Sequence, residues 1–209
     1  MHDRTGLTGT PPVAVRLVTA RLRLAPLAIA DAAELAAVTD HPIITGRIDF
    51  LSSPFGPAQA RALIESDPGF HGIRLAADGQ LIGLLGAHRG PTDGGGSAIE
   101  IGYWIGPAFQ RCGYAREALT AMLRALHGEI VFAECHPANI PSWSLLLQWA
   151  SSPPAAPESA RAGRDSPTCR RHEYMLALGR KSRYKTITAL FGSGCCVRYG
   201  VTAFDTSPS

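Results

Sequence analysis

Apolar residues recur up to Ala150 with the periods of strands and helices. Alternating apolar positions predict strands over 13–25, 70–76, 80–88, 99–105 and 130–135. Apolar spacings of three and four predict helices over 32–38, 58–65, 115–127 and 143–149. The Asp78-Gly79 pair separates two alternating runs and predicts a tight hairpin turn. This order of elements predicts an α/β domain with a hairpin at its centre.

The pattern changes after Ala150. Residues 151–167 are rich in Ser, Pro and Ala and have almost no apolar periodicity, which is typical of a loop. Glu173–Leu178 predicts one more short strand, whereas the weak apolar patches further on predict no clear element. We therefore expect a flexible N-terminal segment over 1–12, a single domain over 13–178 and a C-terminal extension over 179–209.

The charge of the chain is small and unevenly distributed. The formal net charge is +3, and residues 151–209 carry nine Lys and Arg against four Asp and Glu. These basic residues are few, and apart from Tyr174 and Tyr184 they lack interleaved aromatic side chains. Nucleic acid is therefore not the expected partner.

Cysteine usage and hydropathy favour a cytoplasmic protein. The five cysteines have no zinc-ligand spacing, and their odd number disfavours a disulfide framework. The first fifteen residues lack the apolar region of a signal peptide, and no run of about 18 apolar residues occurs. We expect no metal and no membrane contact, while association as a homodimer stays open.

One stretch, Ile99–Leu126, carries the candidate chemistry. Its alternating strand leads through a tight loop into an amphipathic helix, and the unpaired N–H groups and dipole of a helix N-terminus attract anions. Gly113 lets a phosphate approach the main chain, and Arg111 and Arg116 add positive charge. This stretch predicts a binding site for the pyrophosphate of a nucleotide-like cofactor.

Segments in the same order resemble a known family. Gln110–Ala115 resembles the acetyl-CoA loop of the GNAT acetyltransferases. Three further segments match its Rim-type branch, which acetylates protein N-termini, in this order: Thr19–Leu22, Glu100–Tyr103 and Asn139–Ser142. The resemblance covers about residues 15–149.

The resemblance implies a GNAT-like fold and acetyl-CoA as the acyl donor. Its mixed central sheet is flanked by helices and splays between 99–105 and 130–135, where the pantetheine arm lies. The implied donor-binding residues are Tyr103, Trp104 and Ile105 through their main chain, Asn139, and the loop residues Gln110, Arg111, Cys112, Gly113, Tyr114, Ala115 and Arg116. Ser142 is implied to protonate the departing thiolate.

Acetyl transfer to an amine also needs a base, because a free amine is largely ammonium at neutral pH. Glu100, on an otherwise apolar strand, is the first candidate; the alternative is a glutamate that pairs with a nearby arginine. Glu134 is the second, with an outward position on a half-exposed strand as its alternative. His136 is the third, although a residue before Pro137 is typical of a turn. A covalent route through Cys112 is disfavoured, because no base is evident beside it.

The chain departs from the family pattern after the last predicted helix. Trp149, Ala150 and Ser151 stand where the family has a Leu-Gly-Phe step, and residues 150–170 form an atypical segment. The resemblance implies an N-acetyltransferase that acts by direct transfer on a primary amine, with a protein N-terminus favoured and a small amine next. The alternative is a non-catalytic or decayed acyl-CoA-binding protein that kept only the donor loop.

Overall fold

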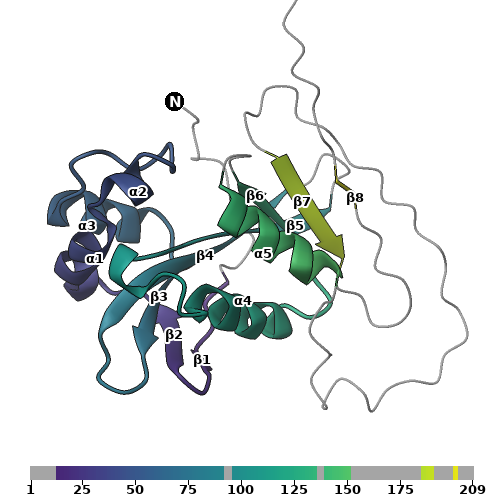
Figure 1. The fold of residues 1–209 in the computed structure, drawn as a ribbon, viewed down its shortest axis with the longest axis horizontal. Coiled ribbons are helices and arrows are strands. Elements are labelled where there is room, and N and C mark those ends of the chain that lie inside the picture. The colour runs from purple at the N-terminus through teal and green to yellow at the C-terminus, as the bar shows by residue number, and fades with distance from the viewer. Residues whose placement is uncertain (1–12, 92–95, 136–138, 152–184, 191–199, 202–209) are drawn as a thin grey trace, which may run out of the picture. The chain divides into compact units, whose positions relative to one another are not determined.

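The computed structural model describes residues 13–91, 96–135, 139–151, 185–190 and 200–201. Figure 1 labels the described helices and strands. The chain divides into two compact units. The first comprises Met1–Gly90 with Ile99–Met122, and the second comprises Pro91–Ala98 with Leu123–Ser209. Each unit is described by itself.

The sheet of the first unit orders its strands as they occur in the chain. These strands are β1 (Leu17–Val18), β2 (Leu22–Pro26), β3 (Phe70–Leu75), β4 (Leu81–Pro91) and β5 (Ser97–Ile105). The pairs β1/β2, β2/β3 and β3/β4 are antiparallel. In the β3–β4 turn Gly79 has a φ of 79°, and the Gln80 amide donates to the Asp78 carboxylate over 2.9 Å. The predicted hairpin is therefore confirmed.

The prediction of one strand over 13–25 was wrong. The chain turns between β1 and β2, because Thr19 satisfies both polar groups of Leu22. The Thr19 amide donates to the Leu22 carbonyl and the Leu22 amide donates to Thr19 Oγ1, each over 2.9 Å. A local hydroxyl thus replaces the ladder partners that a continuous strand would need.

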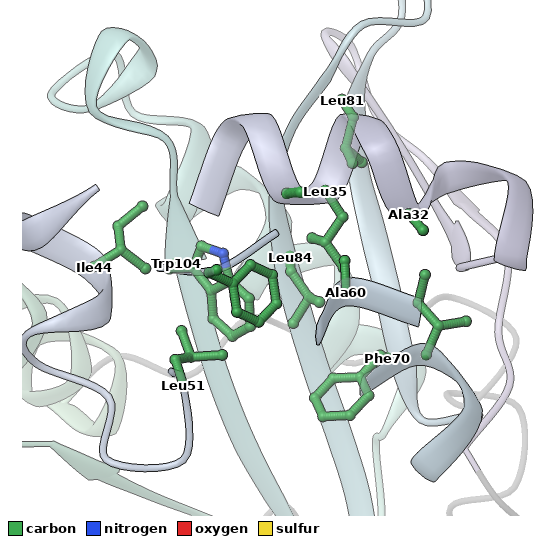
Figure 2. Packing of buried hydrophobic residues seen from close by; sticks show 12 residues of the cluster. Ala32, Leu35, Ile44, Leu51, Ala60, Phe70, Leu81, Leu84 and Trp104 are labelled. Carbon is green, nitrogen blue, oxygen red and sulfur yellow. The ribbon is translucent and has the colours of Figure 1, made fainter. Parts of the chain in front are cut away.

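Three helices cover one face of this sheet: α1 (Ala32–Thr39), α2 (Pro42–Thr45) and α3 (Pro57–Ser66). The predictions of α1 and α3 are confirmed, whereas the short helix α2 was not predicted. Their apolar side chains form one core with β3, β4 and β5 (Figure 2). Trp104 of β5 lies in this core beside Leu51 and Leu84, and its indole N–H donates to the buried Thr39 hydroxyl over 3.0 Å.

The opposite face of the sheet is buried as well. Every residue of β4 from Leu81 to Ala87 is buried, although successive side chains point to opposite faces. Helix α4 (Tyr114–Ala125) has a stripe of buried residues at Ala118, Leu119 and Met122. The helix predicted over 115–127 is confirmed, with bounds shifted by one or two residues.

The second unit contains β6 (Ile130–Cys135), α5 (Ile140–Ser151), β7 (Lys185–Leu190) and β8 (Gly200–Val201). Strand β6 has the predicted bounds, and α5 extends the predicted helix at both ends. Strand β7 pairs antiparallel with β6 and with β8. The strand predicted over 173–178 lies outside the described residues, so the boundary between 178 and 179 stays a prediction.

No helix in the described part of the chain is long and apolar enough to cross a membrane.

A buried histidine ties the N-terminal segment to the sheet. The His71 side chain is fully buried, and its Nε2 accepts the Val15 amide over 3.2 Å while Nδ1 lies 2.9 Å from the Gly69 carbonyl. The contact with Val15 requires an unprotonated Nε2. Burial lowers the pKa of His71 below its ordinary 6.5, and nearby His88 lowers it further, against the raising effect of hydrogen bonds to Gly69 and Leu85 and of Asp67.

We expect His71 to make folding stability depend on pH. The unfolded chain takes up a proton near pH 6.5, whereas the folded chain resists it until a lower pH. Stability from His71 is therefore complete above pH 6.5 and is lost as pH falls through the folded pKa, with a slope of at most about 1.4 kcal/mol per pH unit. Urea unfolding between pH 5 and 7 measures this slope. His71→Gln should reduce the slope of unfolding free energy against pH, whereas the control His127→Gln should leave it unchanged. Equal slopes in the wild type and both variants would contradict the assignment.

Candidate functional site

The connection from β5 to α4 begins with a tightly held strand end. The Gly106 amide donates to the Ile82 carbonyl of β4 over 2.8 Å, and a Cβ at Gly106 would collide with the Val38 side chain. A 3₁₀ turn over Pro107–Phe109 follows. The Gln110 side-chain amide then donates back to the Ile105 carbonyl over 2.9 Å. Gln110 therefore closes the loop onto the strand end.

Left-handed backbone marks the middle of this loop. Arg111 has a φ of 62° and Gly113 a φ of 81°, and the left-handed region costs a side-chain-bearing residue about 1–2 kcal/mol. The Glu117 amide donates to the Gly113 carbonyl over 3.1 Å, so the helical hydrogen bonds begin from Gly113. The amides of Arg111, Cys112 and Gly113 find no acceptor within the described ranges. Successive N–H groups in such turns, next to a helix N-terminus, form concavities that bind anions.

A polar cluster from the N-terminal hairpin lies against this helix start. Glu117 Oε1 accepts from the Thr19 hydroxyl over 2.6 Å and from the Arg21 amide over 2.9 Å, and Oε2 accepts from Arg21 Nε over 2.7 Å. Burial alone raises the pKa of Glu117, but these hydrogen bonds and the charge of Arg21 together lower it below its ordinary value. Glu117 is therefore a carboxylate at neutral pH and holds both groups.

The structure brings the predicted loop residues together in the first unit. Arg111, Cys112, Gly113 and Arg116 are exposed, whereas Tyr114 and Ala115 are half-buried. The thiol of Cys112 donates to the Gln110 carbonyl over 3.5 Å. Within the described residues this thiol forms no hydrogen bond with a carboxylate or an imidazole.

The predicted residues of β5 have different surroundings. Trp104 and Ile105 are buried and Tyr103 is half-buried, so the Trp104 side chain belongs to the core. The pairing of their main chain with a ligand stays a prediction. Glu100 is half-buried, and none of the described arginines forms an ion pair with it.

The remaining predicted residues lie in the second unit or outside the described residues. Glu134 is exposed on β6, Ser142 is half-buried near the start of α5, and the Asn139 carbonyl accepts the Trp143 amide over 2.9 Å. Asn139 therefore lies directly before α5 and accepts a hydrogen bond from its first turn. His136 lies outside the described residues. In the described ranges no group of three or more His, Cys, Asp or Glu residues could hold a metal ion.

Sequence reasoning missed the part played by Arg21 and Glu117. Thr19–Leu22 matched the family pattern, but nothing in the sequence assigned that segment a contact. The two residues are 96 positions apart, and no local periodicity links them. A carboxylate in the first turn of the predicted helix and an arginine within a matched segment were the available signals.

Comparison with known proteins identifies the fold. The acetyltransferase (GNAT) domain model matches residues 21–148. A GNAT-family acetyltransferase from Bacillus anthracis is 21% identical with a TM-score of 0.56, over 64% of this chain and 81% of that chain. RimL, a ribosomal L7/L12 alpha-N-protein acetyltransferase in complex with coenzyme A, is 15% identical with a TM-score of 0.54, over 63% and 80%. The microcin C7 self-immunity acetyltransferase MccE in complex with acetyl-CoA and AMP is 16% identical with a TM-score of 0.51, over 62% and 78%. A comparison with curated proteins finds no match.

We expect Gly113→Ala to destabilise the protein. Its φ of 81° strains any side chain, and the new Cβ would lie 3.4 Å from Arg21 Nη2. The expected loss is about 1–2 kcal/mol in the free energy of unfolding, measured with urea. Gly90→Ala is the matched control, because Gly90 has no positive φ and its Cβ would meet open space; its effect should stay within about 0.5 kcal/mol. Equal stability of the two variants would contradict a constrained backbone at Gly113.

Proposed function

The chain belongs to the acetyltransferase (GNAT) family, and we propose that it moves an acetyl group from acetyl-CoA to a primary amine. The observation that carries this proposal is the loop before α4. Its left-handed residues Arg111 and Gly113 stand at a helix N-terminus beside exposed arginines, an arrangement suited to a pyrophosphate. The coenzyme A and acetyl-CoA complexes of RimL and MccE support the identity of the donor.

The proposed donor site uses main-chain groups more than side chains. The N–H groups of residues 111–116 bind the pyrophosphate, and the main chain of 103–105 pairs with the pantetheine amides in the manner of an added strand. Asn139 donates a hydrogen bond to the donor. Gln110 acts within the loop, where its amide already contacts the Ile105 carbonyl.

The acceptor amine must lose a proton before its nitrogen can form the new bond. Acetyl-CoA supplies the activated acetyl group as a thioester. We assign the removal of the proton to Glu100, directly or through a water molecule, with Glu134 as the second candidate. Ser142 returns a proton to the sulfur when the thiolate departs. Direct transfer leaves Cys112 without a covalent role.

A protein N-terminus is the favoured acceptor, and a small amine such as an antibiotic or polyamine comes next. The resemblance of four ordered segments to the Rim-type branch supports this choice. At 15% identity the likeness to RimL supports the fold and not the acceptor, since one fold serves many substrates.

A binding and turnover experiment tests the proposal. Acetyl-CoA at a hundred times its Kd should add about 2.7 kcal/mol to stability and raise the melting temperature. Thiol release is then measured with N-terminal peptides and small amines. A thermal shift without thiol release would favour the non-catalytic acyl-CoA-binding alternative. The absence of any shift at saturating acetyl-CoA would overturn the donor assignment.

We expect Glu100→Gln to lower kcat/KM about 100-fold and to flatten the acid limb of the pH–rate profile, because the amide cannot accept the proton. Glu65→Gln is the control: Glu65 is exposed on α3, and its replacement should change neither quantity. An unchanged profile in Glu100→Gln together with a slower Glu134→Gln would assign the base to Glu134.

A further inference from the structure

Arg21 contacts the loop before α4 at several successive residues. Its Nη1 donates to the Cys112 carbonyl over 3.0 Å, and its guanidinium carbon lies 4.6 Å from the centre of the Tyr114 ring. Between them, Gly113 lies so close that a Cβ there would be 3.4 Å from Arg21 Nη2. One side chain of the N-terminal hairpin thus spans residues 112–114.

Glu117 fixes the position of this guanidinium. Its two oxygens accept from Arg21 Nε, the Arg21 amide and the Thr19 hydroxyl. The carboxylate is therefore hydrogen-bonded to both the side chains and the main chain of the hairpin. The Glu117 side chain is only 18% exposed, against 48% for Arg21. The more buried carboxylate is therefore the fixed partner, and the arginine extends from it over the loop.

The contact with the Cys112 carbonyl sets the direction of an amide. The peptide group between Cys112 and Gly113 is planar, and in a trans peptide the C=O and the following N–H point in opposite directions. Because Arg21 holds the Cys112 oxygen, the Gly113 N–H must point away from Arg21. A flip of this peptide would present the carbonyl oxygen where the N–H now points, and an oxygen would repel an anion there.

We propose that Arg21 and Glu117 are positioning residues that hold residues 112–114 in the conformation that binds the pyrophosphate of the acyl donor. This inference rests on the proposed function for the identity of the ligand. Arg21 acts through the Cys112 carbonyl, and Glu117 acts through Arg21.

The sign of one substitution separates positioning from simple charge. Glu117 is a carboxylate beside a proposed anion site, so on charge alone Glu117→Gln should tighten acetyl-CoA binding. On the positioning assignment it should weaken binding. The glutamine amide keeps one acceptor oxygen for the three donors that Glu117 now accepts, and it carries no charge, so it holds the guanidinium over the loop less firmly.

The experiment measures the Kd of acetyl-CoA by isothermal titration calorimetry, at a temperature where circular dichroism shows each variant folded. Arg21→Gln and Glu117→Gln should each raise Kd about tenfold, as expected when a charge-assisted hydrogen bond is lost. The double variant should bind nearly as well as either single variant, because both changes remove the same contact. Arg21→Lys should bind acetyl-CoA as weakly as Arg21→Gln, since lysine keeps the charge but lacks the planar guanidinium that contacts Glu117 and Cys112 together.

Matched controls separate this effect from stability and net charge. Arg23→Gln removes one positive charge from an exposed position on β2 and should leave Kd unchanged. Urea midpoints are measured alongside, because a purely structural pair would lower the midpoint and leave Kd of the folded protein unaffected. That result would overturn the assignment. A lower Kd in Glu117→Gln, or a wild-type Kd in Arg21→Lys, would overturn it as well. Wild-type protein that binds no acetyl-CoA would instead overturn the proposed function.

Discussion

The backbone at Arg111 and Gly113 is the constraint around which the loop before α4 is built. Both residues have left-handed φ values, and Arg111 has a side chain that disfavours this region. Such a loop persists only if its two ends are fixed. The strand end is fixed by Gly106 and by the burial of Trp104, and the helix start is fixed by the buried stripe of α4. Core packing therefore maintains a conformation that the loop would not adopt alone.

The pair formed by Arg21 and Glu117 adds a second, polar constraint at the same place. It connects the turn between β1 and β2 with the first turn of α4. Glu117 in the first helical turn also interacts favourably with the helix dipole, so one carboxylate stabilises the helix start and orients the arginine. The hydrogen bond from Arg21 to the Cys112 carbonyl thus connects the hairpin with the centre of the loop.

Local patterns predicted most of the described elements because local physics decides them. An Asp-Gly pair prefers a tight turn wherever it occurs, and the alternation over 130–135 leaves one arrangement with a buried face. The loop was also predictable, because the alternating pattern ends at Ile105, the helical pattern begins after Gly113, and glycine accepts the positive φ found between them. These features need only neighbours within a few residues.

The errors and omissions arise where a distant partner or a single hydroxyl decides the structure. The alternation over 13–25 continues through Thr19, and only the hydrogen bonds between Thr19 and Leu22 reveal the turn. The partner of β6 is the strand at 185–190, where the apolar pattern is weak. A strand forms there because pairing with β6 supplies stability that the local sequence lacks. Arg21 and Glu117 meet across 96 positions, which no periodicity encodes.

The proposed donor site uses main-chain groups more than side chains. A pyrophosphate held by backbone N–H groups requires a backbone conformation, and many sequences satisfy it if one position accepts a positive φ. Side chains are then constrained only where they hold that conformation, as Arg21 does at the Cys112 carbonyl. The proposed donor site therefore depends first on backbone conformation, and on side chains only where they hold that conformation.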